Sequence, residues 1–335
     1  KANQQYVNSL NVFPVPDGDT GTNMVLTMQA AYDEVANSSE RNCGKMAHAI
    51  AHGALMGARG NSGVILSQLW RGFARALDNL DTLDAKNWTL ALAASRDTAY
   101  KGVVRPVEGT ILTVSKDIAT AAETQLANSQ DMEEMLAAIV EAADQSVQRT
   151  PDLLPVLRDA GVVDSGGKGL FFILEGFLRF LRGQSLEIAA SVVQPLAEMN
   201  LENAMEAIEP GQDYEVVVDF RPFEALDLPV FYSTLEEMGT SIQVGEGDGM
   251  YRMHIHVPLD KRYTPIDYVM TVGTITKVAM ENLVAQMEAR EEPCGGAGKY
   301  NYAPLEPGQI AVIAVAPGAG IARVFASLGA AGIVE

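Results

Sequence analysis

Apolar and polar positions alternate with the period of an α-helix through the first half of the chain. Between residues 24 and 182, apolar residues recur about every three to four positions, as on one buried helix face. Residues 132–147 are a clear example, and residues 170–181 are another. In the second example Glu175 and Arg179 lie four apart on the outer face, where they favour an ion pair. The pattern predicts roughly eight helices. Their glycine- or proline-containing joints lie at 57–63, 102–109 and 160–169.

The pattern changes near residue 186, where short alternating segments typical of strands begin. The predicted elements are a strand at 214–220, a helix at 225–239, a hairpin of 241–244 with 250–257, and a helix at 265–273. Residues 274–290 favour no single structure. A small α+β domain over residues 186–290 follows from these elements.

The end of the sequence carries a third pattern. Residues 291–308 are rich in glycine, proline and charge, which is typical of a linker. Residues 309–335 read as a strand, a glycine loop, a helix and a second strand, the opening of a parallel α/β domain. Only 27 residues are available from Gln309 to Glu335, so we expect the sequence to end inside that domain, truncating it. The predicted fold is multidomain: all-α over 1–185, α+β over 186–290, a linker, and the start of an α/β domain.

Composition excludes some partners. The 335 residues are 47% hydrophobic, and 43 acidic against 24 basic residues give a formal net charge of −19. A surface of that sign repels nucleic acid and anionic lipid. No apolar run approaches the length of a membrane span, so no integral membrane segment is expected. The two cysteines, Cys43 and Cys294, are far apart in the sequence, and we expect a cytoplasmic, reducing location.

The strongest candidate chemistry lies in residues 11–24. Pro14 and Pro16 keep this arm extended, and it ends in Asp17 and Asp19, one glycine apart, just before a helix that we expect Thr22 or Asn23 to cap. Carboxylates beside a helix N-terminus suit Mg²⁺, which completes its shell with substrate phosphates. A magnesium–nucleotide site is therefore the first hypothesis. The alternative is a turn in which both aspartates only cap backbone N–H groups.

Residues 57–64 form a second candidate phosphate contact. Small residues let the N–H groups of Asn61 to Val64 face an anion, and Arg59 is placed to stabilise charge on a transferred phosphoryl group. An ordinary helix start with an exposed arginine is the competing interpretation.

Two further loops are candidates for the nucleotide. Gly109 and Thr110 precede a predicted helix at 111–126, where they would contact a base or ribose; a simple interhelical turn is the alternative. Residues 164–169 resemble a P-loop only superficially, because Gly169 stands where a P-loop has Ser or Thr. Gly166 and Gly167 remain candidates for a backbone clamp.

His254 and His256 alternate on a predicted strand, so both imidazoles point to the same face. That arrangement can hold Zn²⁺ with a third ligand. Packed, hydrogen-bonded histidines are the alternative.

Taken together, residues 8–24, 57–63, 104–113 and 164–169 resemble the ATP-binding subunit of bacterial fatty acid kinase. Its N-terminal domain is similar to the ATP-binding subunit of dihydroxyacetone kinase. The resemblance implies an eight-helix barrel over 1–185, a homodimer, ATP with Mg²⁺ on Asp17 and Asp19, and a separate lipid-binding protein that presents the fatty acid. The implied phosphate contacts are Thr20, Gly21, Thr22, Asn23, Gly60, Asn61, Ser62 and Gly63. We also expect nucleotide contacts at Gly109, Thr110, Asp164, Gly166 and Gly167.

Two positions depart from these families. Val12 stands where dihydroxyacetone kinases have a third aspartate, which leaves Asn11 as the nearest additional oxygen ligand for Mg²⁺. Glu215 replaces a cysteine that acts with the histidine pair in the fatty acid kinase subunit. Zn²⁺ held by Glu215, His254 and His256 is the corresponding expectation.

The predicted activity is transfer of the γ-phosphoryl group of ATP to a fatty acid carboxylate, giving an acyl phosphate. A carboxylate is already an anion at neutral pH and needs no catalytic base. Two alternatives stay open: a nucleotide-binding scaffold or sensor without transfer activity, and a hydroxyl kinase of the dihydroxyacetone type.

Overall fold

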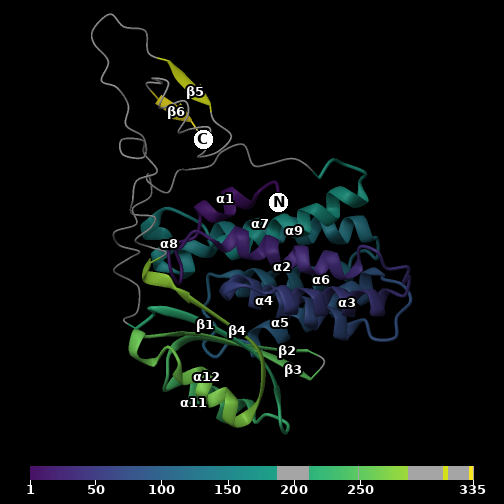
Figure 1. Ribbon diagram of the computed structural model, residues 1–335. Coiled ribbons are helices and arrows are strands. Elements are labelled where there is room, and N and C mark those ends of the chain that lie inside the picture. Colours follow the sequence, from purple (N-terminus) through teal and green to yellow (C-terminus); the bar gives the residue numbers. More distant parts are fainter. Residues whose placement is uncertain (187–210, 248, 286–311, 316–331, 335) are drawn as a thin grey trace, which may run out of the picture. The chain divides into compact units, whose positions relative to one another are not determined.

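The computed structural model describes residues 1–186, 211–247, 249–285, 312–315 and 332–334. Two compact units make up the chain, Lys1–Val284 and Ala285–Glu335. The first unit holds the candidate site and consists of a helical part followed by a small sheet (Figure 1).

Residues 1–186 form the helix-rich region that the sequence predicts. Its helices are α1 (Gln4–Ser9), α2 (Thr20–Val35), α3 (Cys43–Gly57), α4 (Gly60–Ala76), α5 (Ala85–Lys101), α6 (Ile111–Leu126), α7 (Met132–Leu153), α8 (Pro155–Ala160) and α9 (Ser165–Leu181). Within this fully described stretch, eight helices follow Asp19, in agreement with the predicted number. The closure of these helices into a barrel stays a prediction.

Helices α7 and α9 confirm the two apolar patterns. Met135, Ile139 and Val147 of α7 have no exposed surface and join the main cluster of buried apolar side chains with Leu112, Ile118 and Leu174. On α9, Glu175 and Arg179 form the expected ion pair, with Nη2 and Oε1 2.8 Å apart. Burial of one helix face thus supplies the core of the helical part.

Two of the three predicted joints are shorter than expected. Helix α4 already begins at Gly60 and α9 at Ser165, so most glycines of 57–63 and 160–169 lie inside first helical turns. A side chain at Gly63 would overlap the Thr27 hydroxyl of α2, and one at Gly169 would overlap the Met24 thioether. These glycines allow close packing of the helices. They interrupt the helical pattern of the sequence, although the helices continue through them.

Four strands within residues 214–282 form an antiparallel sheet. Its strands are β1 (Tyr214–Pro222), β2 (Thr240–Gly247), β3 (Met250–Val257) and β4 (Gly273–Asn282), in the order β2-β3-β1-β4. The strand at 214–220, the hairpin and the helix α12 (Thr264–Val272) are confirmed. Helix α11 (Leu228–Glu236) is shorter than the predicted 225–239, and the undecided residues after 273 begin with the edge strand β4.

The two faces of this sheet differ in chemistry. On β3, Met253, Ile255 and Val257 are fully buried and pack with side chains from α11 and α12. The alternate residues Arg252, His254 and His256 are also buried, but they lie on the opposite face. Figure 1 shows α11 and α12 on one side of the sheet and α3 to α5 on the other. We call the second side the polar face, made of Glu215, Asp219, Gln243, Arg252, His254 and His256. It packs against the helical part instead of solvent.

The second unit contains one described pair of strands, β5 (Ile313–Val315) and β6 (Gly332–Val334), which pair in parallel. This agrees with the predicted parallel strands. The predicted helix at 321–328 and the linker at 291–308 lie outside the described residues. Among the helices described, none combines the length and the apolar character that crossing a bilayer requires.

Candidate functional site

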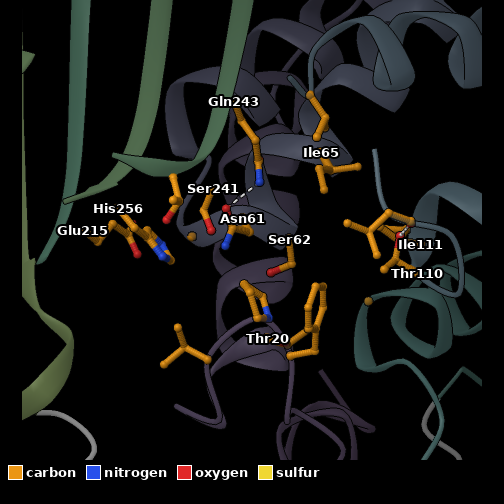
Figure 2. Close-up of a pocket in the computed structure, with 18 of the residues that line it drawn as sticks. Thr20, Asn61, Ser62, Ile65, Thr110, Ile111, Glu215, Ser241, Gln243 and His256 are labelled. Carbon is orange, nitrogen blue, oxygen red and sulfur yellow. Dashed lines mark hydrogen bonds between the residues drawn. The ribbon is translucent and has the colours of Figure 1, made fainter. Parts of the chain in front are cut away.

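A cavity of about 400 Å³ lies between the helical part and the polar face of the sheet (Figure 2). It brings together predicted residues from four segments of the helical part and from two strands of the sheet. The predicted residues that line it are Asn11, Asp17, Asp19, Thr20, Asn23, Gly60, Asn61, Ser62, Thr110, Asp164, Gly166, Glu215 and His256. Each helical segment contributes through the start of a helix, where backbone N–H groups lack partners within the helix.

Other predicted residues are not part of this lining. They are Arg59, Gly21, Thr22, Gly63, Gly109, Gly167 and His254. Arg59 is exposed, and its proposed contact with a phosphoryl group requires its side chain to turn toward the cavity. His254 lies directly behind the lining, in contact with Glu215.

The carboxylate arm is fixed by Asn11, whose side chain is 2% exposed. The Asn11 amide donates to the carbonyl of Val15 at 2.7 Å. Its oxygen accepts both the backbone N–H of Thr20, at 3.0 Å, and the Thr20 hydroxyl. The hydroxyl of Ser165, at the start of α9, donates to Thr20 at 3.1 Å. This arm therefore joins the first turns of α2 and α9, with half-buried Asp17 and Asp19 on the cavity wall.

The prediction that Thr22 or Asn23 caps α2 was wrong. The helix begins at Thr20, with Asp19 at the position before it, so both residues lie inside the first turn. The backbone N–H of Thr22 donates to the side-chain oxygen of Asn8 at 3.0 Å, which turns this residue toward α1. A helix that starts earlier places more of the arm within reach of its N-terminal N–H groups.

The start of α4 is held by residues of the sheet. Gly60, with a φ of 56°, donates its backbone N–H to Glu215. The side-chain amide of Gln243 on β2 donates to the side-chain oxygen of Asn61 (Figure 2). Ser62 follows on the cavity wall. The anion-binding geometry predicted for this turn thus depends on the side chains of Glu215 and Gln243 in the sheet.

Asp164 is the N-cap of α9 and is 5% exposed. Burial raises the pKa of its carboxyl to about 7, although hydrogen bonds from the N–H groups of Gly167 and Ile111 lower it in part. The Gly167 N–H donates to the Asp164 carboxylate at 2.6 Å and is therefore part of the helix cap. Gly166 stays on the cavity wall.

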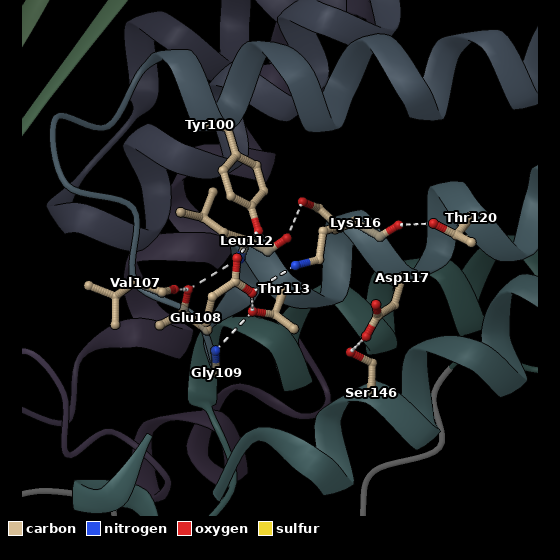
Figure 3. A network of polar contacts seen from close by, with 12 residues as sticks. Tyr100, Val107, Glu108, Gly109, Leu112, Thr113, Lys116, Asp117, Thr120 and Ser146 are labelled. Atoms are coloured by element: carbon tan, nitrogen blue, oxygen red, sulfur yellow. Dashed lines mark hydrogen bonds and ion pairs between the residues drawn. The ribbon is translucent and has the colours of Figure 1, made fainter. Parts of the chain in front are cut away.

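Thr110 caps α6, and its hydroxyl accepts the N–H of Leu112 at 3.3 Å. A polar network behind it fixes the preceding turn (Figure 3). The Glu108 carboxylate accepts hydrogen bonds from Tyr100 at 3.1 Å, Thr113 at 2.6 Å and Lys116 at 3.0 Å. Burial alone would raise the pKa of Glu108, but these three donors hold it below its ordinary value.

That network also explains Gly109. Its backbone N–H donates to the Thr113 hydroxyl at 2.8 Å, and its φ of 83° suits glycine. Gly109 therefore shapes the turn, and its neighbour Thr110 reaches the cavity.

Glu215, His254 and His256 form a compact donor cluster. One ligand atom from each residue lies within 4.8 Å of the others. The Nδ1 atom of His254 lies 3.2 Å from the carbonyl oxygen of Ser241, and that of His256 lies 3.3 Å from the amide oxygen of Gln212. Since both partners are acceptors, each Nδ1 donates to its partner, and Nε2 is the ring nitrogen left to face a ligand.

Both Nε2 atoms are buried without a hydrogen-bond partner. His254 Nε2 lies 3.4 Å from Glu215 Oε1. This distance is short enough for an ion pair, but the two atoms do not form a hydrogen bond. Burial lowers the pKa of His256 to about 3, so this imidazole is neutral. Burial would raise the pKa of Glu215, but the neighbouring His254 holds it below its ordinary value. A carboxylate beside two imidazole Nε2 atoms that lack hydrogen-bond partners matches a metal-ligand set.

Sequence reasoning missed several polar residues of the cavity. Ser241 and Gln243 come from β2, Gln212 precedes β1, and Ser165 comes from α9. The available signal was the alternation of polar residues on β3, which marks a polar face but does not say what covers it.

The fold and the cavity define a helical domain that gathers carboxylates and helix N-termini around one polar site. Residues 14–179 match the model of the DAK2 domain. This part of the chain is similar to a DAK2 domain.

Related proteins share nearly the whole chain. A protein of Staphylococcus saprophyticus is 38% identical over 337 residues, which cover 98% of this chain and 61% of the relative. Relatives from Staphylococcus epidermidis and Staphylococcus aureus are 37% identical, with 99% of this chain and 61% of each relative covered. The chain thus spans about 61% of the length of these relatives.

Among solved structures, the native form of the dihydroxyacetone kinase of C. freundii is similar at a TM-score of 0.38 and 20% identity. The similarity covers 53% of this chain and 31% of that chain.

Proposed function

We propose that this chain is the Mg²⁺- and ATP-binding part of a phosphotransferase, which acts as a dimer together with a separate lipid-binding protein. The observation that carries the proposal is the meeting of Asp17 and Asp19 with the starts of α2, α4 and α9 on one cavity. Carboxylates alone would repel a phosphate at this place. With a divalent cation between them, they and the helix N-termini bind the same triphosphate.

The side chains fit Mg²⁺. Asp17 and Asp19 supply hard oxygen ligands on the cavity wall. The Asn11 oxygen already accepts two hydrogen bonds from Thr20, so in this proposal Asn11 holds the start of α2 and is the weakest of the three predicted ligands. When bound, Mg²⁺ neutralises phosphate charge during transfer.

The residues of the chain bind and align the nucleotide. The N–H groups at Asn61 and Ser62 face the phosphates from the start of α4, and Thr110 and Gly166 contact the nucleotide from the starts of α6 and α9. Such alignment is the main contribution a protein makes to phosphoryl transfer, because the reaction needs little covalent chemistry from side chains.

The proposed acceptor is a fatty acid carboxylate, which gives an acyl phosphate. Its pKa of about 4–5, by analogy with acidic side chains, makes it an anion at neutral pH, so it attacks without a base. The resemblance of the carboxylate arm to the fatty acid kinase subunit supports this acceptor.

One observation favours a hydroxyl acceptor of the dihydroxyacetone type. Asp164 lines the cavity, and burial raises its pKa to about 7, which suits a general base for a hydroxyl group. The match to the DAK2 domain supports this second candidate equally. Substitution Asp164→Asn separates the two, because it should abolish transfer to a hydroxyl and leave transfer to a carboxylate largely intact.

Calorimetry tests the nucleotide site. Asp17→Ala and Asp19→Ala should each abolish Mg²⁺-dependent ATP binding while the circular dichroism spectrum stays unchanged. Asp33→Ala, which removes an exposed carboxylate from the far end of α2, is the matched control and should bind ATP as the wild type does. Unchanged ATP affinity in both cavity variants would refute the proposal.

Acceptor assays test the reaction. ATP consumption that requires both a fatty acid and a lipid-binding partner supports the acyl phosphate product. Turnover of dihydroxyacetone without that partner supports the hydroxyl kinase, and binding without any turnover supports the scaffold.

We further propose that Glu215, His254 and His256 hold Zn²⁺. The two partnerless Nε2 atoms and the neighbouring carboxylate carry this assignment. When bound, Zn²⁺ would supply a fixed positive centre beside the start of α4, since Glu215 also accepts the Gly60 N–H. Metal analysis of the purified protein, with His256→Ala as the variant that should lose the ion, tests the assignment.

A further inference from the structure

Arg252 lies on the polar face, on strand β3, and is only 2% exposed. Its guanidinium forms a two-point contact with Asp219, with Nε–Oδ1 and Nη2–Oδ2 distances of 2.5 Å each. Because Asp219 is also buried and lies opposite Arg252 in the strand register, the pair carries no net charge. Arg252 therefore does not act on the cavity as a free cation.

The remaining donors of Arg252 leave the sheet and reach the helical part. Nη1 donates to the carbonyl oxygen of Leu55 and to that of Ala58, the latter at 2.9 Å. Nη2 donates to the carbonyl oxygen of Met56 at 3.1 Å. With Asp219, these acceptors use all five N–H groups of the guanidinium. Lysine, with three donors on one nitrogen, cannot reproduce this planar pattern.

The three carbonyls belong to the end of α3 and the residue that follows it. The last carbonyls of a helix lack partners within the helix, and a positive group there is favourable. Arg252 thus satisfies the C-terminus of α3 two residues before Gly60, where α4 begins. The turn between these helices is fixed from the sheet side.

Two other residues of the polar face hold the other side of the same turn. Glu215 accepts the Gly60 N–H, and Gln243 donates to Asn61. Three side chains from three strands therefore determine where Gly60, Asn61 and Ser62 lie on the cavity wall. A turn that only joined two helices would need none of them.

We propose that Arg252, held by Asp219, is a positioning residue that presets the start of α4 for the phosphates of the nucleotide. The inference rests on the proposed nucleotide site and deepens it, because it makes the sheet a working part of that site. Arg252 acts through the carbonyls of Leu55, Met56 and Ala58 and touches no ligand. Loss of Arg252 should therefore lower the affinity for ligands with phosphates and leave the affinity for the nucleoside unchanged.

The test compares Mg²⁺–ATP and adenosine by calorimetry. Arg252→Lys keeps the charge opposite Asp219, and the double variant Arg252→Met with Asp219→Val removes both charges, which a folded core tolerates better than one unpaired charge. Arg71→Met is the matched control. It breaks another contact between a helix and the sheet, the 2.7 Å ion pair with Glu246, without touching the turn.

Both Arg252 variants should bind Mg²⁺–ATP about tenfold more weakly, the scale expected when binding must order a turn that was preset. Adenosine affinity should stay unchanged, and Arg71→Met should bind both ligands as the wild type does. Unchanged ATP affinity in the folded variants overturns the inference. An equal loss for ATP and adenosine, or an equal loss in Arg71→Met, also overturns it, because either result indicates general loosening.

Hydrogen exchange provides a readout that does not depend on nucleotide binding. The amides of residues 60–63 should exchange faster in Arg252→Lys than in Arg71→Met, while those in the middle of α4 stay equally protected. If wild-type protein binds no Mg²⁺–ATP, the proposed function fails by itself, and this exchange pattern still decides whether Arg252 fixes the turn. Equal exchange in the two variants overturns that role.

Discussion

The buried carboxyl of Asp164 should leave a measurable signature in the pH dependence of stability. It caps α9 with a side-chain oxygen that accepts the Gly167 N–H at 2.6 Å. The substitution Asp164→Asn removes the titrating group but keeps an oxygen of the same shape for this hydrogen bond. The cap survives while the proton equilibrium disappears.

The magnitude follows from the position of that equilibrium. Burial raises the pKa of Asp164 from 3.8 to about 7. Between these values the folded state holds a proton that the unfolded chain has released, so the free energy of unfolding falls as pH rises. The contribution is fully present below about pH 4 and lost above about pH 7, and a shift of about three units corresponds to about 4 kcal/mol.

His256 contributes to the pH dependence of stability with the opposite sign. Burial lowers its pKa to about 3, so the unfolded chain binds a proton that the folded state rejects, and stability rises with pH up to about 6.5. Wild-type protein should therefore show a shallow net dependence. Because His256 is present in both proteins, the difference between wild type and Asp164→Asn isolates Asp164.

Urea unfolding at several pH values measures that difference. Both tryptophans of the chain, Trp70 and Trp88, lie in the helical part, so their fluorescence reports on the unit that contains Asp164. Relative to that of the variant, the free energy of unfolding of the wild-type protein should fall by about 3 kcal/mol between about pH 5 and about pH 8. A difference that stays constant over this range would refute the buried, proton-binding state of Asp164.

Three further predictions are independent of nucleotide binding. Gly21→Ala should destabilise the protein by about 2 kcal/mol or more, because its methyl would overlap the carbonyl of Gln4, and a melting temperature equal to wild type would contradict this. Gly176→Ala, on α9 with open space around it, should stabilise by up to about 1 kcal/mol; a lower melting temperature would count against it. Zn²⁺ added to chelator-treated protein should raise the melting temperature, and His254→Ala should abolish the rise. No rise in wild-type protein would exclude the metal site.

The parts of the site that could be predicted are those with local chemistry. Asp17 and Asp19 follow a proline-stiffened arm, and Asn61 and Ser62 open a helix. A helix start is recognisable from its own residues, because the unsatisfied N–H groups and the small polar side chains lie next to each other in sequence. These residues therefore reach one cavity as expected.

Glycines were harder to interpret. Gly60 and Gly166 line the cavity, but Gly21, Gly63 and Gly167 lie against neighbouring helices or the Asp164 cap. A glycine needed for close approach of a ligand and one needed for close approach of another helix look the same in sequence. Only the packed structure separates them.

The role of the sheet depended on contacts far apart in the chain. Residues 250–257 alternate in the way typical of a strand with one solvated face, yet Arg252 and His256 are buried against the helical part. The contact between Arg252 and Met56 spans 196 positions. No local pattern encodes such a contact, so the sequence predicted a separate middle domain and not a wall of the same cavity.

The central claim is that Asp17 and Asp19 bring a divalent ion and a triphosphate to the starts of α2 and α4. The most direct measurement is a crystal structure with Mn²⁺ and a non-hydrolysable ATP analogue, in which anomalous scattering locates the metal. The account predicts Mn²⁺ bound by Asp17 and Asp19, with phosphate oxygens on the N–H groups of Asn61 and Ser62. Both carboxylates directed away from the ion, or a nucleotide bound outside this cavity, would contradict it.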